Sequence, residues 1–227
     1  MKIFINDIPV YIRKYSDDIL REDYNVIIDG DLISTPSKKL IDDVLVTNAS
    51  NEDVDHLLKL MTQKKFRHLD AVTFTVRKRR DTVSFIKRKF KVMLAAGGVA
   101  TNGNKVILIY RHKKWDLPKG KLKKKEAIVN GAVREVEEEC NIKVKAGERI
   151  CTTWHTYLRN GKFILKKTYW YEMVCLDDSK MAPQIGEEIE EVRLMDFDQT
   201  RIALYNSYRT VRHVMKLHYK LQALIKA

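Results

Sequence analysis

Residues 120–142 read GKLKKKEAIVNGAVREVEEECNI, in which a lysine-rich run is followed by four glutamates within six positions. Between residues 127 and 140 the apolar side chains recur at helical spacing and form one stripe, while Glu135, Glu138 and Glu139 share a neighbouring face. Carboxylates this close repel one another unless a cation lies between them. The stretch therefore predicts a helix that either is merely solvated or holds a hard metal ion beside an anionic substrate.

The composition is that of a soluble globular protein. Its 227 residues are 44% hydrophobic and 32% charged, enough for one large domain or two small ones with buried cores. The sequence has no run of about 18 apolar residues, and its N-terminus lacks the apolar core of a secretory signal. Three cysteines without a CxxC pair suggest neither a disulfide framework nor a cysteine-based zinc site. We therefore expect a cytoplasmic protein without a membrane partner.

Positive charge is concentrated in the second part of the chain. The formal net charge is +13, to which residues 1–90 contribute 17 Lys and Arg against 14 Asp and Glu, and residues 91–227 contribute 26 against 16. Residues 105–125 contain nine Lys and Arg and one acid, Asp116. Such a cluster predicts an anionic partner, with phosphates first, although a basic surface that only aids solubility is the alternative. Nucleic acid is compatible with this charge, but no RNA-binding motif is present.

The first part, residues 1–88, is predicted to form a small N-terminal α/β domain of unknown role. Short alternating runs predict strands, and Ser50 or Asn51 caps the clearest helix, which has early acids and late lysines. A short helix is expected after Pro36, and a basic helix is the expected connector to the rest of the chain. The strands are expected at 2–7, 8–12, 24–29 and 69–76, and the helices at 37–46, 50–65 and 79–90.

The second part, residues 89–227, predicts strands that meet at Asn-Gly turns. One hairpin is expected around the NGN turn at 102–104 and a second around the NG pair at 160–161, followed by a strand at 192–197. The tail, 199–225, is predicted to be one amphipathic helix that packs on the domain. Its apolar face comprises Val211, Val214, Leu217, Leu221 and Leu224.

The opening stretch also spells a spaced pattern. The pattern consists of Gly120, Glu126, Arg134-Glu135-Val136, Glu138-Glu139 and Asn141-Ile142, separated by five, seven, one and one residues. It resembles the signature box of the Nudix hydrolase family, G-x5-E-x7-R-E-U-x-E-E-x-G-U, where U is aliphatic. The departure is Asn141, which stands where the family has glycine. Asparagine is the usual second choice for the left-handed backbone expected there. The resemblance includes WDLPKG and AAGGV upstream, covers residues 90–200, and does not reach the N-terminal domain.

The resemblance implies the fold class α/β (α+β), as a Nudix-type α-β-α sandwich with a mixed β-sheet. It also implies an enzyme that hydrolyses a pyrophosphate bond in a nucleoside diphosphate linked to another moiety, with Mg²⁺ or Mn²⁺ as cofactor. Oxygen ligands suit these hard ions. The metal would lower the pKa of bound water, bridge phosphate oxygens and offset charge on the leaving phosphate.

Carried over position by position, the resemblance assigns roles to residues of the box. Glu138 and Glu139 would bind the metal, and Glu135 would be either a third ligand or the base that takes a proton from the attacking water. The carbonyl of Lys119 would complete the metal shell, and Arg134 would orient Glu135 through an ion pair. The supporting positions would be Gly120 and Glu126.

A glutamate outside the box often serves as the base or as an additional ligand in this family. The candidates lie in the loop before residue 192, and Glu188 is the first choice. Each of them is also compatible with a solvated loop charge. The four candidates are Glu187, Glu188, Glu190 and Glu191.

Cations and aromatic residues near the box bear on the substrate. The cations could hold further phosphates and the aromatics could stack on a base, although most aromatics in strands fill a core. His155 is expected to be a hydrogen-bonded strand residue and not a catalyst. The expected substrate-binding residues are Arg111, Lys113, Lys114, Lys119, Lys121 and Trp115, and the other aromatic candidates are Trp154, Tyr157, Tyr169 and Trp170.

WDLPKGK is similar to the Nudix branches that act on dinucleoside polyphosphates and diphosphoinositol polyphosphates, and to messenger RNA decapping enzymes. A dinucleoside polyphosphate or a similar small anionic nucleotide is the leading substrate. One alternative is an RNA 5′-end pyrophosphohydrolase, and another is a non-catalytic Nudix-like ligand sensor. The intact carboxylates and the near-neutral N-terminal domain count against the sensor. A homo-oligomer is compatible with the sequence.

Overall fold

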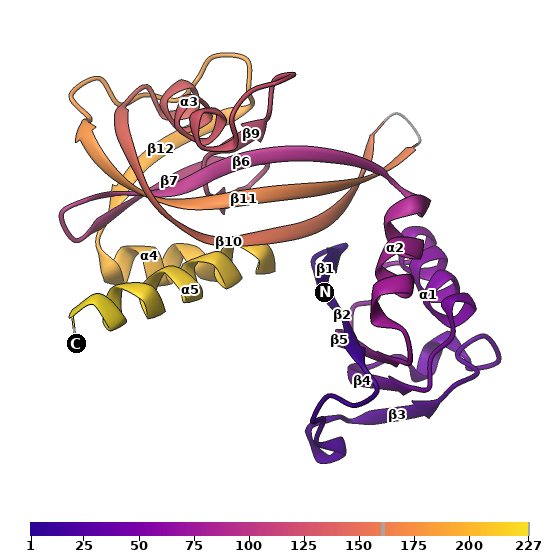
Figure 1. Cartoon of the computed structure of the whole chain (residues 1–227). Coiled ribbons are helices and arrows are strands. Elements are labelled where there is room, and N and C mark those ends of the chain that lie inside the picture. The colour runs from indigo at the N-terminus through magenta and orange to yellow at the C-terminus, as the bar shows by residue number, and fades with distance from the viewer. Residues whose placement is uncertain (160–161, 227) are drawn as a thin grey trace. The chain divides into compact units, whose positions relative to one another are not determined.

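The computed structural model of the chain describes residues 1–159 and 162–226. The chain divides into two compact units, each with its own core (Figure 1). Unit 1 contains Met1–Val92 and Trp154–Lys166, and unit 2 contains Met93–Thr153 and Lys167–Ala227. A segment from the middle of the chain therefore joins the N-terminal unit.

Unit 1 is built on a mixed sheet. Its strands follow the spatial order β1-β2-β5-β4-β3, in which β1 and β2 are antiparallel and the remaining pairs are parallel. The part of β10 that belongs to this unit pairs with β1 in parallel, with Phe4 opposite His155. The strands are β1 (Lys2–Ile5), β2 (Ile8–Lys14), β3 (Val26–Asp29), β4 (Asp42–Thr47) and β5 (Leu69–Val76).

Two helices, α1 (Asn51–Gln63) and α2 (Arg79–Lys89), pack in unit 1. The expected cap of α1 is confirmed, because the Ser50 hydroxyl accepts a hydrogen bond from the Asp53 N–H while the Asp53 carboxylate accepts one from the Ser50 N–H. Asp53 also accepts from the Leu32 N–H at 2.8 Å, which ties a loop to the helix start. The remaining elements are two short 3₁₀ turns, η1 (Arg21–Asp23) and η2 (Ser37–Lys39).

The helix expected at 37–46 is wrong. Only η2 is helical there, and the chain then enters β4, which lies between β3 and β5. Val44, Leu45 and Val46 are all buried, so this strand is covered on both faces. A continuous apolar run is typical of a central parallel strand, and the run is too short to distinguish a strand from a buried helix by periodicity.

Unit 2 contains a second sheet region, in the order β12-β7-β6-β11-β10, with β8 on β7 and β9 on β6. The hairpin expected at 102–104 is confirmed, since Asn102 pairs with Lys105 across its turn. The turn expected at 160–161 lies outside the described residues. The strands are β6 (Lys91–Asn102), β7 (Lys105–Arg111), β8 (Lys114–Asp116), β9 (Lys119–Lys121), β10 (Lys143–Arg159), β11 (Lys162–Asp177) and β12 (Ile189–Met195).

Helices cover both faces of the sheet in unit 2. α3 (Ile128–Cys140) lies on one face, and α4 (Phe197–Tyr205) and α5 (Arg209–Lys226) lie on the other (Figure 1). Each face has its own buried apolar cluster, one including Ala132 and Val136 of α3 and the other including Val211 and Val214 of α5. The expected α-β-α sandwich is therefore confirmed.

The tail forms two helices where one was expected. The break falls after α4, where the Trp115 N–H donates to the carbonyl of Asn206 at 2.9 Å and the Asn206 amide donates to the carbonyl of Lys113 at 3.0 Å. These bonds to a distant segment replace the helical pattern. Of the face expected to pack, Leu224 is 67% exposed, which corrects that part of the prediction.

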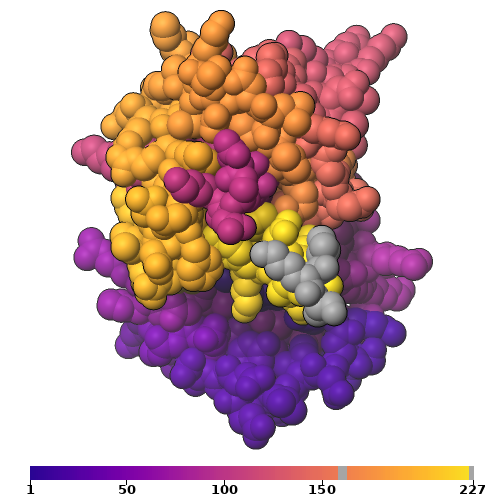
Figure 2. Space-filling view, turned by 90° about the vertical axis from the view of Figure 1, so that its left-hand side faces the viewer, coloured from indigo at the N-terminus to yellow at the C-terminus, as the bar shows by residue number. Residues whose placement is uncertain are grey.

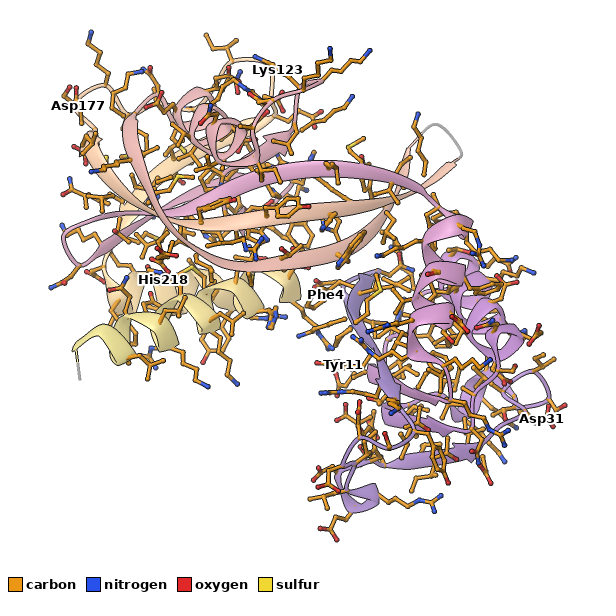
Figure 3. All side chains as sticks on the ribbon, in the orientation of Figure 1. Phe4, Tyr11, Asp31, Lys123, Asp177 and His218 are labelled. Atoms are coloured by element: carbon orange, nitrogen blue, oxygen red, sulfur yellow. The ribbon has the colours of Figure 1, made fainter. Side chains whose placement is uncertain are left out.

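Polar contacts fix α5 and the first hairpin of unit 2. On α5, His218 points toward the sheet (Figure 3), and its Nδ1 lies 2.8 Å from both carboxylate oxygens of Glu172 on β11. The turn between β6 and β7, magenta in Figure 2, is held where Asn102 donates to Asp178 at 2.9 Å. Among the residues described, no helix is long and apolar enough to cross a membrane.

Candidate active site

The glutamate-rich helix α3 is fixed at its C-terminal end by the loop that follows β11. Asn141 has φ 51° and ψ 50°, which confirms the left-handed backbone expected there. Its side-chain amide donates to the carbonyl of Lys180 at 2.6 Å. The Ala182 and Gln184 N–H groups donate to the carbonyls of Cys140 and Glu139, which satisfies two carbonyls at the helix end. The loop and the helix are therefore one hydrogen-bonded structure.

Arg134 is the cation at the centre of the α3 carboxylates. It forms a two-point pair with Glu126, with Nε 2.7 Å from Oε1 and Nη2 2.9 Å from Oε2. Its Nη2 also donates to the carbonyl of Lys121 at 3.2 Å. Hydrogen bonds from Arg134 and from the Lys123 N–H lower the pKa of Glu126 to about 2. Glu126 therefore stays ionised and holds the guanidinium in place.

Glu135 and Glu138 share the remaining nitrogen of Arg134. Nη1 lies 2.8 Å from Glu135 Oε1 and 2.8 Å from Glu138 Oε2. Burial raises the pKa of Glu135, and the charges of Glu138 and Glu187 add to this, although Arg134 opposes it. Glu138 is 42% exposed, and the ammonium of Lys123, on the loop before α3 (Figure 3), lies 3.9 Å from it. Two carboxylates thus converge on one cationic position.

Gly120 makes room for Glu135. A Cβ atom at position 120 would overlap the Glu135 carboxylate. The backbone of β9 therefore approaches α3 as closely as a residue without a side chain permits. The predicted supporting role of Gly120 remains a prediction, and this close approach gives it a physical basis.

Glu139 is the buried carboxylate of the helix, only 2% exposed. It accepts a hydrogen bond from the Lys119 N–H at 2.8 Å and another from Nη1 of Arg111 at 3.3 Å. Burial raises the pKa of Glu139 to about 7, even though Lys119 and Arg111 favour its ionised form. The positive charges of Lys119 and Arg111 therefore do not fully offset the effect of burial on this carboxylate.

A second buried pair lies beside Glu139. The ammonium of Lys119 donates to Asp116 at 2.5 Å and to the carbonyl of Leu117 at 3.3 Å. Burial opposes the ionisation of Asp116, but Lys119 and Arg111 outweigh it and hold the pKa of Asp116 below its usual range. The sequence reasoning missed this role of Asp116. The signal was available, because Asp116 is the single acid among nine neighbouring cations.

The expectation that three carboxylates of α3 meet at one point does not hold for these side-chain positions. Among the described residues, no three His, Cys, Asp or Glu side chains are arranged to hold a metal ion. Glu135 and Glu138 converge on Arg134, whereas Glu139 faces Arg111. The donor set still fits a divalent cation, because it consists of hard oxygen ligands and because burial leaves Glu135 and Glu139 with raised pKa values.

The predicted substrate-binding cations differ in their availability. Lys113 and Lys121 are exposed, while the Lys119 ammonium is buried against Asp116 and cannot reach a substrate in this arrangement. Arg111 is turned toward Glu139, and Lys114 lies 5.3 Å from the ring centroid of Tyr208. The carbonyl of Lys119, expected as a metal ligand, stays a prediction.

The aromatic residues that were expected to stack on a base differ in their burial and contacts. Trp115 packs against Tyr110, with centroids 5.0 Å apart, and carries Arg193 over its ring at 5.4 Å. Trp170 is 1% exposed and donates to the Thr153 hydroxyl, so it is a core residue and cannot stack on a base. Trp154 is half-buried and belongs to unit 1.

The loop glutamates can be told apart by their surroundings. Glu188, the first choice from sequence, is 76% exposed and lies 3.4 Å from Nε2 of His112, with a left-handed φ of 55°. The neighbouring Glu187 is the loop carboxylate whose charge raises the pKa of Glu135. Of the four loop glutamates, Glu187 is thus the one whose charge acts on a carboxylate of α3.

Comparison with known proteins gives the class of this fold and site. The sequence model described as NUDIX domain matches residues 91–215. The chain therefore belongs to the Nudix family of hydrolases, whose members generally use divalent metals. No curated protein sequence matches the chain.

Solved structures with a similar fold include several Nudix proteins. One is a Nudix hydrolase from Nitrosomonas europaea, with 26% identity over 56% of this chain and 69% of that chain, at a TM-score of 0.44. A second is an Ap4A hydrolase from C. elegans in a binary complex, with 20% identity over 58% and 98% of the two chains, at a TM-score of 0.44. A third is a MutT protein from Methanosarcina mazei Go1, with 16% identity over 58% and 96%, at a TM-score of 0.45.

Proposed function

We propose that this chain is a divalent-metal-dependent pyrophosphohydrolase of a nucleoside diphosphate linked to another moiety, with a dinucleoside polyphosphate or a similar polyanionic nucleotide as substrate. The observation that carries the proposal is the pair of glutamates, Glu135 and Glu138, that already share one cationic nitrogen at 2.8 Å each. Glu139 adds a buried carboxylate on the same helix. Together they provide oxygen ligands for Mg²⁺ or Mn²⁺.

In this proposal, the residues of the chain would have the following roles. Glu138 and Glu139 would hold the metal with the carbonyl of Lys119, and Arg134, anchored by Glu126, would orient Glu135. When bound, the metal supplies a Lewis acid that offsets charge on the phosphates and lowers the pKa of bound water. Glu135 is suited to accept a proton, because burial raises its pKa above the usual value of a glutamate.

The polyanionic substrate is supported by the charge around the site. Lys113, Lys121 and Lys123 are exposed or partly exposed on the segments before α3, where they can contact phosphates. An ammonium group there acts as a point charge for phosphate oxygens. Arg111 would join them only after it leaves Glu139.

Two loop carboxylates are available for the attacking water. Glu188 stays the candidate base from the sequence, and Glu187, whose charge acts on Glu135, is the second candidate. Glu187→Gln and Glu188→Gln, compared at saturating substrate, separate the two. The base is the residue whose loss lowers kcat and removes the corresponding limb of the pH profile.

A matched pair of variants on α3 tests the function. Glu138→Gln should lower kcat at least about 100-fold, because a neutral amide is a poor ligand for a hard cation. Glu137→Gln is the control, since Glu137 lies on the same helix but bonds to Lys143 at 3.1 Å and to the Val144 N–H. Equal activity of the two variants would contradict the assigned site.

The substrate is tested with the full chain and Mg²⁺ or Mn²⁺ on a panel of anhydrides, with products separated by anion-exchange chromatography. The panel contains dinucleoside polyphosphates, ADP-ribose, nucleoside triphosphates, diphosphoinositols and 5′-triphosphate RNA. Fastest turnover of dinucleoside polyphosphates is expected. Preferred release of pyrophosphate from RNA would instead establish the RNA 5′-end reaction, and no turnover with any substrate would favour a non-catalytic sensor.

A further inference from the structure

Unit 1 carries a segregated positive charge that the hydrolytic site does not use. Residues 1–76 contain 10 Lys and Arg against 13 Asp and Glu, whereas residues 77–91 contain eight against one, Asp81. Within residues 1–91, the positive charge is therefore concentrated on α2 and the residues next to it. Segregated charge produces a local field, which mixed charge serving only solubility would cancel.

The cations of α2 gather on its outward face. Arg80, Lys87 and Arg88 are spaced i, i+7 and i+8, so they lie on one side of the helix, and all three are exposed. The opposite side, with Thr82 and Ile86, is buried in unit 1. We call the three exposed residues the cationic face of α2. Arg80 and Arg88 at its two ends are eight positions apart, a helical rise of about 12 Å, and Arg77 and Lys91 extend the charge beyond both helix ends.

Most of this charge has no internal partner. Lys89 pairs with Asp55 at 3.1 Å, and Arg79 donates to the carbonyl of Ile12 at 3.0 Å. No acidic partner contacts Arg80 or Arg88 within the ranges that the structure covers, and the same is true of the flanking cations Arg77, Lys78 and Lys91. Charges left unpaired in this way are available to an external anion.

Aromatic rings lie beside the cationic face. The ammonium of Lys87 is 5.1 Å from the ring centroid of Trp154, and that of Lys89 is 4.8 Å from the centroid of Phe85. Both rings are half-buried and belong to unit 1. Cations interleaved with flat rings suit a polyanion that also carries bases, since the bases stack while the phosphates are neutralised. The apolar side of α2 is already buried, which argues against insertion into a lipid surface.

We propose that the cationic face of α2, with Trp154, binds single-stranded nucleic acid. The inference is independent of the hydrolytic site, because every residue that carries it lies in unit 1. RNA and DNA both provide the required phosphates and bases, and the test distinguishes them. A surface of this kind would retain an anionic polymer on the protein whatever nucleotide unit 2 hydrolyses.

The test measures binding by the full chain in EDTA, where metal-dependent hydrolysis is off. Fluorescently labelled 12-mers with 5′-hydroxyl ends, as single-stranded RNA, single-stranded DNA and duplex, are titrated by anisotropy at several salt concentrations. Parent binding is expected to be tighter for a single strand than for the duplex and to weaken steeply with salt. Tighter duplex binding, equal binding of polyglutamate, or no binding at low salt would overturn the proposal.

Two triple variants with the same change in net charge locate the surface. Arg80→Glu/Lys87→Glu/Arg88→Glu should lower affinity at least about 10-fold and reduce the slope of log K against log salt by about 2, because three phosphate contacts are lost. The control, Arg21→Glu/Lys38→Glu/Lys39→Glu, changes exposed cations elsewhere in unit 1 and should leave both quantities near those of the parent. Equal losses in the two variants would show that net charge alone is responsible.

The milder variant Arg80→Gln/Lys87→Gln/Arg88→Gln distinguishes a loss of binding contacts from a loss of folding. Thermal unfolding should show the parent transition for it, and its affinity should lie between those of the parent and the glutamate variant. Hydrolysis of small nucleotides by unit 2 should be unchanged in all of these variants. Full-affinity binding by the glutamine variant would overturn the proposal even if the glutamate variant fails to fold.

Discussion

α3 and α2 have the highest fractions of charged residues among the helices of their units, and they differ in whether those charges are paired. Each acidic side chain of α3 has a cation within reach: Arg134 for Glu135 and Glu138, Lys143 for Glu137, and Arg111 for Glu139. On α2, the three residues of the cationic face have no acid to neutralise them among the residues described. Charge in α3 is therefore part of the internal structure, and charge in α2 faces outward.

The difference has an energetic meaning. Removing one member of a buried ion pair leaves the other charge without a partner in a low dielectric, which is strongly destabilising. Removing an exposed, unpaired charge changes little, and where like charges repel it stabilises. Substitution of a charge should therefore have a large destabilising effect in α3 and a small effect of either sign in α2, and measurements of stability and activity test this difference.

The largest effect is expected for Arg134→Met. Glu126, Glu135 and Glu138 would lose their shared cation and repel one another, so the side chains that shape the site would move apart. We expect kcat/KM to fall at least about 100-fold and the unfolding midpoint to fall as well. Steady-state kinetics and thermal unfolding measure the two quantities. Lys143→Met, which removes an exposed cation paired with Glu137, is the control and should change neither.

The second effect is on stability and concerns Asp116→Asn. The variant leaves the buried Lys119 ammonium without a carboxylate, which costs about 3 kcal/mol in the free energy of unfolding. Because the pKa of Asp116 is lowered in the folded state, its ionised form contributes stability above its unfolded pKa, and this is lost as the pH falls. Urea unfolding at pH 7 measures the deficit. If exposed Asp198→Asn loses as much, burial is not the cause.

A smaller, pH-dependent effect is expected for Glu139→Gln in metal-free protein. The pKa of Glu139 rises from 4.5 to about 7 on folding, so this group stabilises the fold below its unfolded pKa and loses that contribution as the pH rises through about 7. The free energy of unfolding of the glutamine variant should therefore rise relative to that of the parent between pH 5 and pH 8, by on the order of 1 to 3 kcal/mol. Unfolding in EDTA across that range measures it, and a parallel pH profile of the two proteins would contradict it.

The smallest effect is expected on α2. Arg80 lies in the first turn, where the helix dipole disfavours a cation, and Arg88 lies in the last turn, where it favours one. Arg80→Glu should therefore stabilise unit 1, and Arg88→Glu should destabilise it, each by about 0.3 to 1 kcal/mol. Unfolding at low salt should resolve the opposite signs. Two changes of the same sign would show that the dipole does not dominate here.

Sequence periodicity predicted most of the elements because their signals are local. The capping box at Ser50, the turn at 102–104 and the left-handed Asn141 are each specified by a few adjacent residues. The predictions that were wrong concern elements that depend on contacts with residues far away in the sequence. Whether residues 42–47 are a strand or a helix depends on β3 and β5 on either side, and the break at Asn206 depends on bonds to Lys113 and Trp115.

The ion pair of Arg134 with Glu135 was expected from the family resemblance and is present, whereas the other charge pairings of these residues were not expected. Spacing on a helix places Glu135 and Glu138 on one side, but it does not show that Arg134 lies between them. The Lys119 cation looked available for substrate because the sequence does not reveal its burial against Asp116. Charge partners depend on how β7, β8 and β9 meet α3, which is a property of the folded sheet.

The one departure from the family box has a consequence for the loop that follows β11. At position 141 glycine would adopt the left-handed backbone more easily, but it has no amide to donate to the Lys180 carbonyl. The backbone bonds from Ala182 and Gln184 would then join this segment to α3 without the side-chain bond. A chain with glycine at position 141 would thus hold this loop to the end of α3 less firmly, so the asparagine accepts a less favourable backbone conformation and gains a tighter attachment of the loop.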